Sequence, residues 1–186
     1  MYHELERTGE AVRLLGIVDT DPARADALAQ EFGCRSFGSL NQLLTTHSEL
    51  QAASVAVPTV HHLRVARELM EAGVDVLIEK PLASSLAEAD ELVRLAAGRE
   101  RVAQVGHLER FNPAVRATAA LITQPMFFEV HRLSIFSPRS LDIDVVLDLM
   151  IHDIDILLHL TGEMPEEIRA AGIRILSPQV DIGNVR

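Results

Sequence analysis

The sequence predicts an α/β fold in which a parallel sheet is followed by a second domain of the α+β kind. Short apolar segments rich in Val, Ile and Leu alternate with segments of helical spacing as far as Gly106, and short links join them. After Gly106 this alternation stops, and longer segments follow. Strands that alternate with helices through short connections are typical of βαβ units, whose strands pair in parallel.

Length, charge and cysteine content limit the class of protein. The 186 residues are enough for one full domain or for two incomplete ones. A formal net charge of -10 argues against nucleic acid and anionic membranes as partners, since phosphate surfaces repel an acidic protein. No spanning apolar run or secretory signal is visible, and Cys34, the only cysteine, excludes an internal disulfide. We therefore expect a soluble cytoplasmic protein.

Residues that start or stop an element bound each segment of the first domain. Asp21 before Pro22 and the capping box Ser85-Leu86-Ala87-Glu88 are typical helix starts, whereas Gly33 and Gly73 are typical of helix ends. The expected helices are residues 1–9, 22–32, 40–44, 60–72 and 85–98. The expected strands are the apolar runs 12–18, 53–57, 74–78 and 102–105.

The second domain is expected to mix longer helices and strands. Its expected helices are residues 113–122 and 145–160, and its expected strands are residues 126–135 and 167–176. The strand segments show partial alternation of apolar and polar residues, which is typical of a sheet with one solvated face. We therefore expect two domains, residues 1–108 and residues 109–186.

The apolar strand 74–78 ends abruptly in Glu79-Lys80-Pro81. In open α/β sheets, ligands bind at the carboxyl ends of the strands, which is where this strand places an acid and a base. Pro81 restricts the backbone of Lys80 to an extended conformation and so directs its side chain. A solvated turn that merely caps the strand is the alternative interpretation.

The apolar helix 145–160 carries a polar stripe. Asp148, His152, Asp155 and His159 recur at spacings of four, three and four, so they lie along one narrow face. Burying such a stripe costs free energy unless its members are paired or functional, and a carboxylate beside a histidine tunes the ring for proton transfer. The stripe itself holds no Lys or Arg partner, which favours a functional site over a self-satisfied polar seam. A metal site built from Asp148, His152 and Asp155 is a further alternative, although nothing in the sequence identifies a metal.

Asp19 follows the strand 12–18. An acid at the end of the second strand of a dinucleotide-binding sheet hydrogen-bonds the adenosine ribose hydroxyls. The same charge repels a 2′-phosphate, so Asp19 favours NAD over NADP. Taken alone, an Asp at this position is more often a simple loop acid.

Four motifs together resemble the Gfo/Idh/MocA oxidoreductase family. They are Val57-Pro58-Thr59 with His62, Glu79-Lys80-Pro81, Arg110-Phe111-Asn112-Pro113, and Asp148-Leu149-Met150-Ile151-His152-Asp153. Their order and separations match the family over nearly the whole chain. Within the family, residues 106–115 and 140–146 look closest to bacterial members that act on nucleotide sugars and are similar to UDP-N-acetylglucosamine 3-dehydrogenases.

The resemblance implies a Rossmann-type domain followed by an α+β domain, and an activity that oxidises or reduces sugar hydroxyls with NAD. It implies a sugar or nucleotide-sugar substrate and a homo-oligomer in the full-length form. The implied catalytic residues are Lys80, His152 and Asp148. The implied cofactor-binding residues are Asp19, Pro58, His62, Glu79 and Lys80. The implied substrate-binding residues are Arg110, Asn112 and His152.

The chain departs from the family pattern at both ends. The family opens with a strand and a Gly-rich turn that holds the pyrophosphate at a helix N-terminus, and this sequence contains neither. The second domain also ends within its expected sheet. We therefore expect a parallel sheet without its first strand and glycine loop, and an incomplete second domain. A catalytically inactive fragment or binding remnant, and a metal-dependent hydrolase or lyase, are the competing interpretations.

Overall fold

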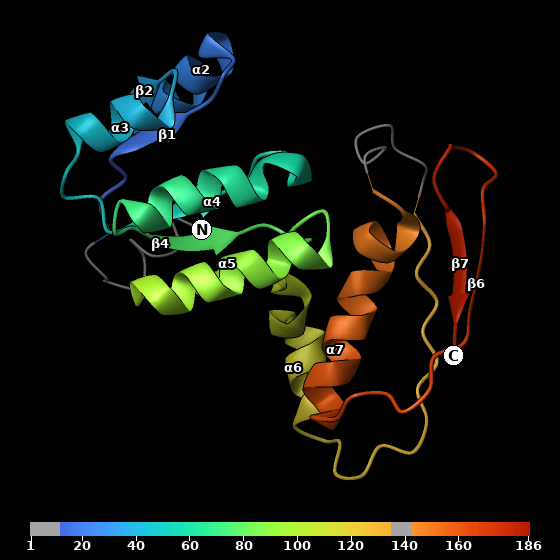
Figure 1. Ribbon diagram of the computed structural model, residues 1–186. Helices are drawn as coiled ribbons and strands as arrows, with labels where there is room; N and C mark the ends of the chain where they lie inside the picture. The colour runs from blue at the N-terminus through green and yellow to red at the C-terminus, as the bar shows by residue number, and fades with distance from the viewer. Residues whose placement is uncertain (1–11, 135–142) are drawn as a thin grey trace.

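The computed structural model describes residues 12–134 and 143–186 (Figure 1). The expected helix over residues 1–9 lies outside this range. The five parallel strands are β1 (Gly16–Val18), β2 (Arg35–Phe37), β3 (Ala52–Val55), β4 (Asp75–Ile78) and β5 (Ala103–Val105). They form one two-stranded sheet, β1–β2, and one three-stranded sheet, β3–β4–β5, which confirms the predicted α/β class with parallel pairing.

The β1–β2 unit is a single βαβ turn. Helix α2 (Pro22–Phe32) begins where Asp21 accepts hydrogen bonds from the backbone N–H groups of Ala23 and Arg24, and it ends at Gly33, whose φ is 65°. Both ends agree with the prediction. Strand β2 was not predicted, because its three residues, Arg-Ser-Phe, lack the apolar run that identifies a buried strand. Helix α3 (Leu40–Thr46), capped by Ser39, follows it.

The β3–β4–β5 sheet holds the main core. The short η1 turn (Thr59–His61) leads into helix α4 (His62–Glu71), and α4 packs with helix α5 (Leu86–Arg99) on one face of the sheet (Figure 1). Val55, Val76 and Ile78 point from the strands into this layer, because alternate strand residues face the same side. The helices contribute Ala66, Leu69, Met70, Leu92 and Ala96.

The η2 turn (Leu108–Phe111) follows β5 and connects the sheet to helix α6 (Pro113–Ala119), with which the second part of the chain begins. A π-helical turn, η4 (Val146–Met150), runs directly into helix α7 (Ile151–Thr161), so the expected helix is present but contains a π turn. Strands β6 (Ala170–Ile173) and β7 (Ile182–Val185) follow α7 and pair as an antiparallel hairpin. The predicted domain boundary falls at the start of η2 and stays a prediction.

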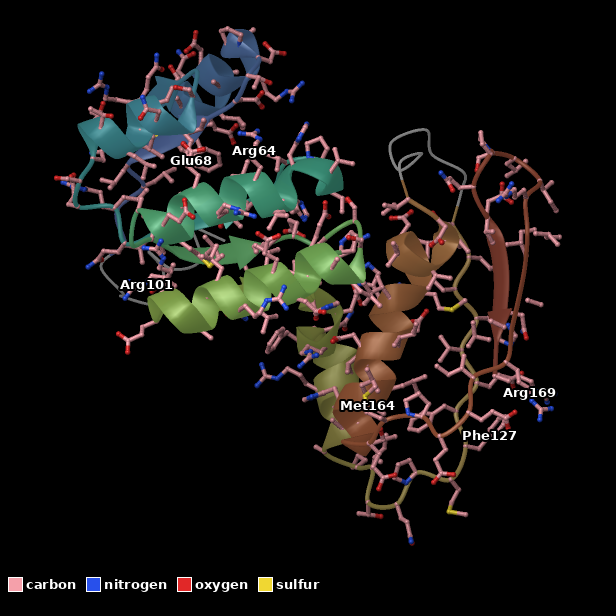
Figure 2. All side chains as sticks on the ribbon, in the orientation of Figure 1. Arg64, Glu68, Arg101, Phe127, Met164 and Arg169 are labelled. Carbon is pink, nitrogen blue, oxygen red and sulfur yellow. The ribbon has the colours of Figure 1, made fainter. Side chains whose placement is uncertain are left out.

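The prediction of a strand over residues 126–135 is wrong for the part that the structure describes. Residues 126–134 run alongside α7 without strand pairing (Figure 1). A strand needs a partner for its backbone hydrogen bonds, and none of the described strands β1 to β7 pairs with this segment. Phe127 and Met164, both labelled in Figure 2, are exposed in this region. Among the described helices, none has the length and apolar character required to cross a bilayer.

Candidate active site

The site lies at the carboxyl edge of the three-stranded sheet. Because β3, β4 and β5 are parallel, the residues that follow them leave the sheet on the same side. Val57-Pro58 follows β3, Glu79-Lys80 follows β4, and Gly106-His107 follows β5. The structure thus brings together three of the loops that the sequence motifs identified.

Lys80 contacts the helix that carries the polar stripe. Its Nζ donates hydrogen bonds to the main-chain oxygen of Asp148 at 2.8 Å and to Asp148 Oδ1 at 3.1 Å. Asp148 lies in the π-helical turn η4, a conformation that is rare and is frequently found at functional sites. The pair is largely buried, with 20% of the Lys80 side chain and 31% of the Asp148 side chain exposed. The two predicted catalytic residues are therefore in direct contact.

His152 lies four residues beyond Asp148, near the start of α7. Burial lowers the pKa of His152, and the positive charges of Lys80 and Arg132 lower it further, against a smaller opposing effect of Glu109 and Asp153. The ring is therefore neutral at neutral pH and has a nitrogen lone pair to accept a proton. Its Nδ1 is buried and has no hydrogen-bond partner among the described residues.

The remaining acids of α7 are paired with arginines from other segments. Arg110 Nε donates to Asp155 Oδ2 at 2.9 Å, and Arg110 Nη2 donates to Asp155 Oδ1. Burial by itself raises the pKa of Asp155, but the Arg110 hydrogen bonds and the His107 charge outweigh it, so this pKa lies below its usual value. The expectation of a stripe without cation partners is wrong, because Lys80 and Arg110 reach it from distant parts of the chain. His159, at the end of the stripe, is exposed.

These pairings bear on two of the predicted roles. The guanidinium of Arg110 is committed to Asp155, so this geometry does not support its predicted contact with substrate. In the described part of the chain, no three His, Cys, Asp or Glu side chains converge as a metal ion requires. Asp148 and Asp155, two of the three ligands of the metal alternative, each turn toward a cation instead.

His62 connects two of the loops at this edge. It is 1% exposed, and its Nδ1 lies 2.9 Å from the carbonyl oxygen of Pro81 while its Nε2 lies 2.9 Å from that of Val57. The peptide bond between Lys80 and Pro81 is cis. Both ring nitrogens thus face carbonyls of the site loops, so His62 links the loop after β3 to the turn that carries Lys80. Its cofactor-binding role stays a prediction.

Replacing His62 by Ala is expected to destabilise the protein by about 2–4 kcal/mol, because it leaves a cavity and removes a ring whose N–H donates to one of the two carbonyls that it faces. Urea unfolding followed by circular dichroism measures this change. The matched control is His61→Ala, since His61 is the exposed neighbour in the chain, and we expect it to cost less than about 0.5 kcal/mol. Equal stability of the two variants would contradict the bracing role.

The other predicted residues occupy defined positions. Asn112 caps α6, with its Oδ1 accepting the Ala114 N–H at 3.0 Å, and Pro58 precedes the η1 turn. The Glu79 carboxylate lies against Gly106, where an added Cβ would come within 3.1 Å of Glu79 Oε2. A side chain at position 106 would crowd this carboxylate, so Gly106, the first residue of the 106–115 resemblance segment, lies at the same strand edge as Glu79.

Asp19 follows β1, as expected for a ribose-binding acid. Its Oδ1 accepts the Asp21 N–H at 2.9 Å and its Oδ2 accepts from Arg24 Nη1 at 3.1 Å. Arg24 was not predicted, although its place in the first turn of α2 lets it reach back to the strand end. Asp19 and Lys80, the residues expected at the ribose end and the nicotinamide end of NAD, each follow a parallel strand. A glycine-rich turn for the pyrophosphate is not present between residues 12 and 134 or after residue 142.

Comparisons with known proteins agree with this geometry. Residues 1–107 match the oxidoreductase family with an NAD-binding Rossmann fold, Gfo/Idh/MocA. The chain is 42% identical over 171 residues to a UDP-N-acetylglucosamine 3-dehydrogenase of Acidithiobacillus ferrooxidans, covering 91% of this chain and 54% of that protein. It is 33% identical to the myo-inositol dehydrogenase Hyg17 of Streptomyces leeuwenhoekii, covering 99% of this chain and 59% of that one.

Solved structures give the same result. A crystal structure of the Acidithiobacillus ferrooxidans UDP-N-acetylglucosamine 3-dehydrogenase superposes with a TM-score of 0.86 at 38% identity. The match covers 98% of this chain and 60% of the solved chain. The chain thus spans a little more than half the length of these relatives.

Proposed function

Because the chain belongs to the Gfo/Idh/MocA oxidoreductase family, we propose that it supplies the hydride-transfer site of an NAD-dependent sugar dehydrogenase. The observation that carries this proposal is the contact of Lys80 with Asp148, one helical turn from a neutral His152. The site therefore combines a cation that attracts a substrate oxygen with a base that accepts its proton.

In the proposed mechanism, the ammonium of Lys80 binds the oxygen of the reacting hydroxyl. Its positive charge stabilises the negative charge that develops on this oxygen as the proton leaves, which is where an electrostatic contact accelerates a reaction most. Asp148 holds Lys80 in place through both its main-chain and its side-chain oxygen. The same pairing keeps the ammonium directed toward the site rather than toward solvent.

His152 takes the hydroxyl proton as general base and returns it when the reaction runs in reverse. NAD, when bound, supplies the acceptor for the hydride that leaves the sugar carbon. Asp19 would hold the adenosine ribose, and Glu79 and Pro58 would line the nicotinamide side. His62 would act indirectly by fixing the turn of Lys80.

The proposed substrate is a UDP-amino sugar. This choice rests on the relative of highest identity described above, a UDP-N-acetylglucosamine 3-dehydrogenase. An assay with NAD that compares UDP-N-acetylglucosamine with myo-inositol, read by nicotinamide absorbance, separates the two classes of relative. Oxidation of the nucleotide sugar alone is the expected result, and preferential oxidation of myo-inositol would overturn the substrate assignment.

Asp19→Ser is expected to weaken NAD binding by about tenfold or more, because a hydrogen bond to a charged group is worth about 1.5–3 kcal/mol. The same change is expected to raise the affinity for NADP relative to NAD, since it removes the charge that repels a 2′-phosphate and leaves Arg24 to attract one. Fluorescence titration with NADH and NADPH measures both effects. Asp26→Asn, which changes an exposed acid of helix α2 away from the strand end, is the control, and an unchanged preference in Asp19→Ser would refute the assignment.

The competing interpretation is a catalytically inactive fragment or binding remnant. Binding of NAD to the purified chain distinguishes this interpretation from the dehydrogenase. Calorimetric titration that gives a micromolar dissociation constant would support the dehydrogenase. Binding too weak to measure, together with no turnover, would support the remnant.

A further inference from the structure

Helix α7 carries two carboxylates that are almost fully buried. Asp153 is 9% exposed and Asp155 is 7% exposed. A buried carboxylate is tolerated only when a partner compensates its lost hydration. Each of these acids has one: Arg132 donates to both oxygens of Asp153 at 2.7–3.0 Å, and Arg110 donates to both oxygens of Asp155.

The two ion pairs attach α7 to different parts of the molecule. Arg110 lies in η2, directly after β5, at the sheet edge from which Lys80 also emerges. Arg132 lies in the segment 126–134, which follows α6 in the second part of the chain. The Arg110–Asp155 pair therefore joins α7 to the turn that leads out of β5 of the parallel sheet, whereas the Arg132–Asp153 pair joins it to a segment of the second part.

His152 lies between two anchors to the sheet. Asp148, which binds Lys80, comes four residues before it, and Asp155, which binds Arg110, comes three residues after it. With a rise of about 1.5 Å per residue, the anchors are roughly two turns apart along the helix. Two contacts restrict the tilt and the rotation of the helix more than a single contact does. His107 Nδ1, 3.8 Å from Asp155 Oδ1, adds a third group of the sheet edge to the second anchor.

We propose that Arg110 and Asp155 are positioning residues, whose ion pair docks α7 on the carboxyl edge of the sheet and so sets the distance from His152 to Lys80. The bidentate geometry suits this role, because the planar guanidinium defines an orientation as well as a separation. The consequence for turnover rests on the proposed function, whereas the docking itself does not.

The test uses the pKa of His152, measured by NMR titration of its ring in the complete chain, with the signal assigned from His152→Gln. The charged groups that act on this ring are Lys80, Arg132, Glu109 and Asp153. Asp155→Asn removes a negative charge and leaves Arg110 unpaired, so electrostatics alone would lower the pKa of His152. Release of α7 from the sheet would instead move the ring away from Lys80 and into water, and would raise its pKa toward the ordinary value of about 6.5. We expect the rise.

Asp153→Asn is the matched control, because Asp153 is equally buried on the same helix but paired within the second part. Its removal takes away an effect that raises the pKa of His152, so the control is expected to shift that pKa downward. Arg110→Lys is the second variant, to be used if Asp155→Asn does not fold. It keeps the positive charge but loses the planar guanidinium, and we expect it to raise the pKa of His152 by less than Asp155→Asn. An unchanged or lower pKa of His152 in the folded Asp155 or Arg110 variant would overturn the proposal.

A kinetic measurement separates this proposal from the proposed function. In active enzyme, Asp155→Asn is expected to lower kcat by about 10- to 100-fold with little change in the KM for NAD, since small misplacements carry losses of this size. An equal loss of kcat in Asp153→Asn would indicate general destabilisation and would count against the docking role. A chain without turnover still gives the NMR result, so failure of the dehydrogenase assignment leaves the docking test intact.

Discussion

Lys80→Ala is expected to abolish measurable turnover, a loss of at least about 100- to 1,000-fold, while NAD binding persists. The substitution removes the positive charge that would stabilise the developing charge on the substrate oxygen. It also leaves Asp148 without the cation that it now binds through two oxygens. Steady-state kinetics in the full-length protein, with NADH titration in parallel, measure the two effects separately.

Arg101→Ala is the matched control for this prediction. Arg101 is a cation at the opposite end of β4, labelled in Figure 2, where it donates to the carbonyl oxygen of Gly73 at 3.0 Å. We expect its replacement to leave turnover within about threefold, because a surface contact of this kind changes stability only slightly. Undiminished turnover in Lys80→Ala would refute the assignment of Lys80 as a catalytic residue.

The composition of the chain offers a second measurement on the same group. Lys80 is the only lysine among the 186 residues. Isotope-labelled reductive methylation therefore places one side-chain probe in the molecule, besides the N-terminal amine. We expect the NMR signal of this probe to shift when Asp148 is replaced by Asn, since Asp148 binds the amine. A signal that does not respond would contradict the observed pair.

His152→Gln is expected to lower kcat by about 100- to 10,000-fold, the usual range for loss of a general base. The pH dependence gives a sharper test. Because the pKa of His152 is lowered, the ring stays neutral to a pH below that of an ordinary histidine, and the rate is expected to fall only on acidification past this lowered pKa. The profile of kcat/KM for the parent should therefore show an acid limb below pH 6.5, and this limb should be absent in His152→Gln.

Two variants check the origin of this limb. Lys80→Met removes one of the charges that lower the pKa of His152, so the ring should titrate at a higher pH in an NMR titration. His159→Gln changes an exposed histidine two turns further along α7 and is expected to leave the limb in place. An acid limb that persists in His152→Gln would assign it to another group.

Local features of the chain were predictable because they depend on neighbouring residues. Helix α2 starts and ends as expected, since an Asp-Pro start and a glycine end act within one turn. The short strand β2 was missed and the strand over residues 126–134 was wrongly expected, for one shared reason. Strand formation is decided by a partner strand elsewhere in the chain, and a segment's own pattern does not contain that partner.

In the site, too, features that depend on neighbouring residues were predictable, and contacts between distant residues were not. The Glu-Lys-Pro sequence after β4 and the spacing of Asp148 and His152 led to the prediction of Lys80, Asp148 and His152 as a set, and the structure places Lys80 in contact with Asp148. Their sequence did not disclose that Arg110 is bound to Asp155, 45 residues away, or that both nitrogens of His62 face carbonyls. Both arrangements result from burial, which forces a charged or polar group to find a partner wherever the fold supplies one.

The sequence by itself determined the α/β class, the alternation of most strands and helices up to β5, and the family. Backbone preferences and side-chain spacing act over a few residues, and so they can be read along the chain. Only the tertiary structure decided which charges meet, because Lys80 and Asp148 are 68 residues apart and their contact depends on how α7 docks against the sheet. Docking of this kind depends on the desolvation of groups from distant segments, a property that exists only once the chain is folded.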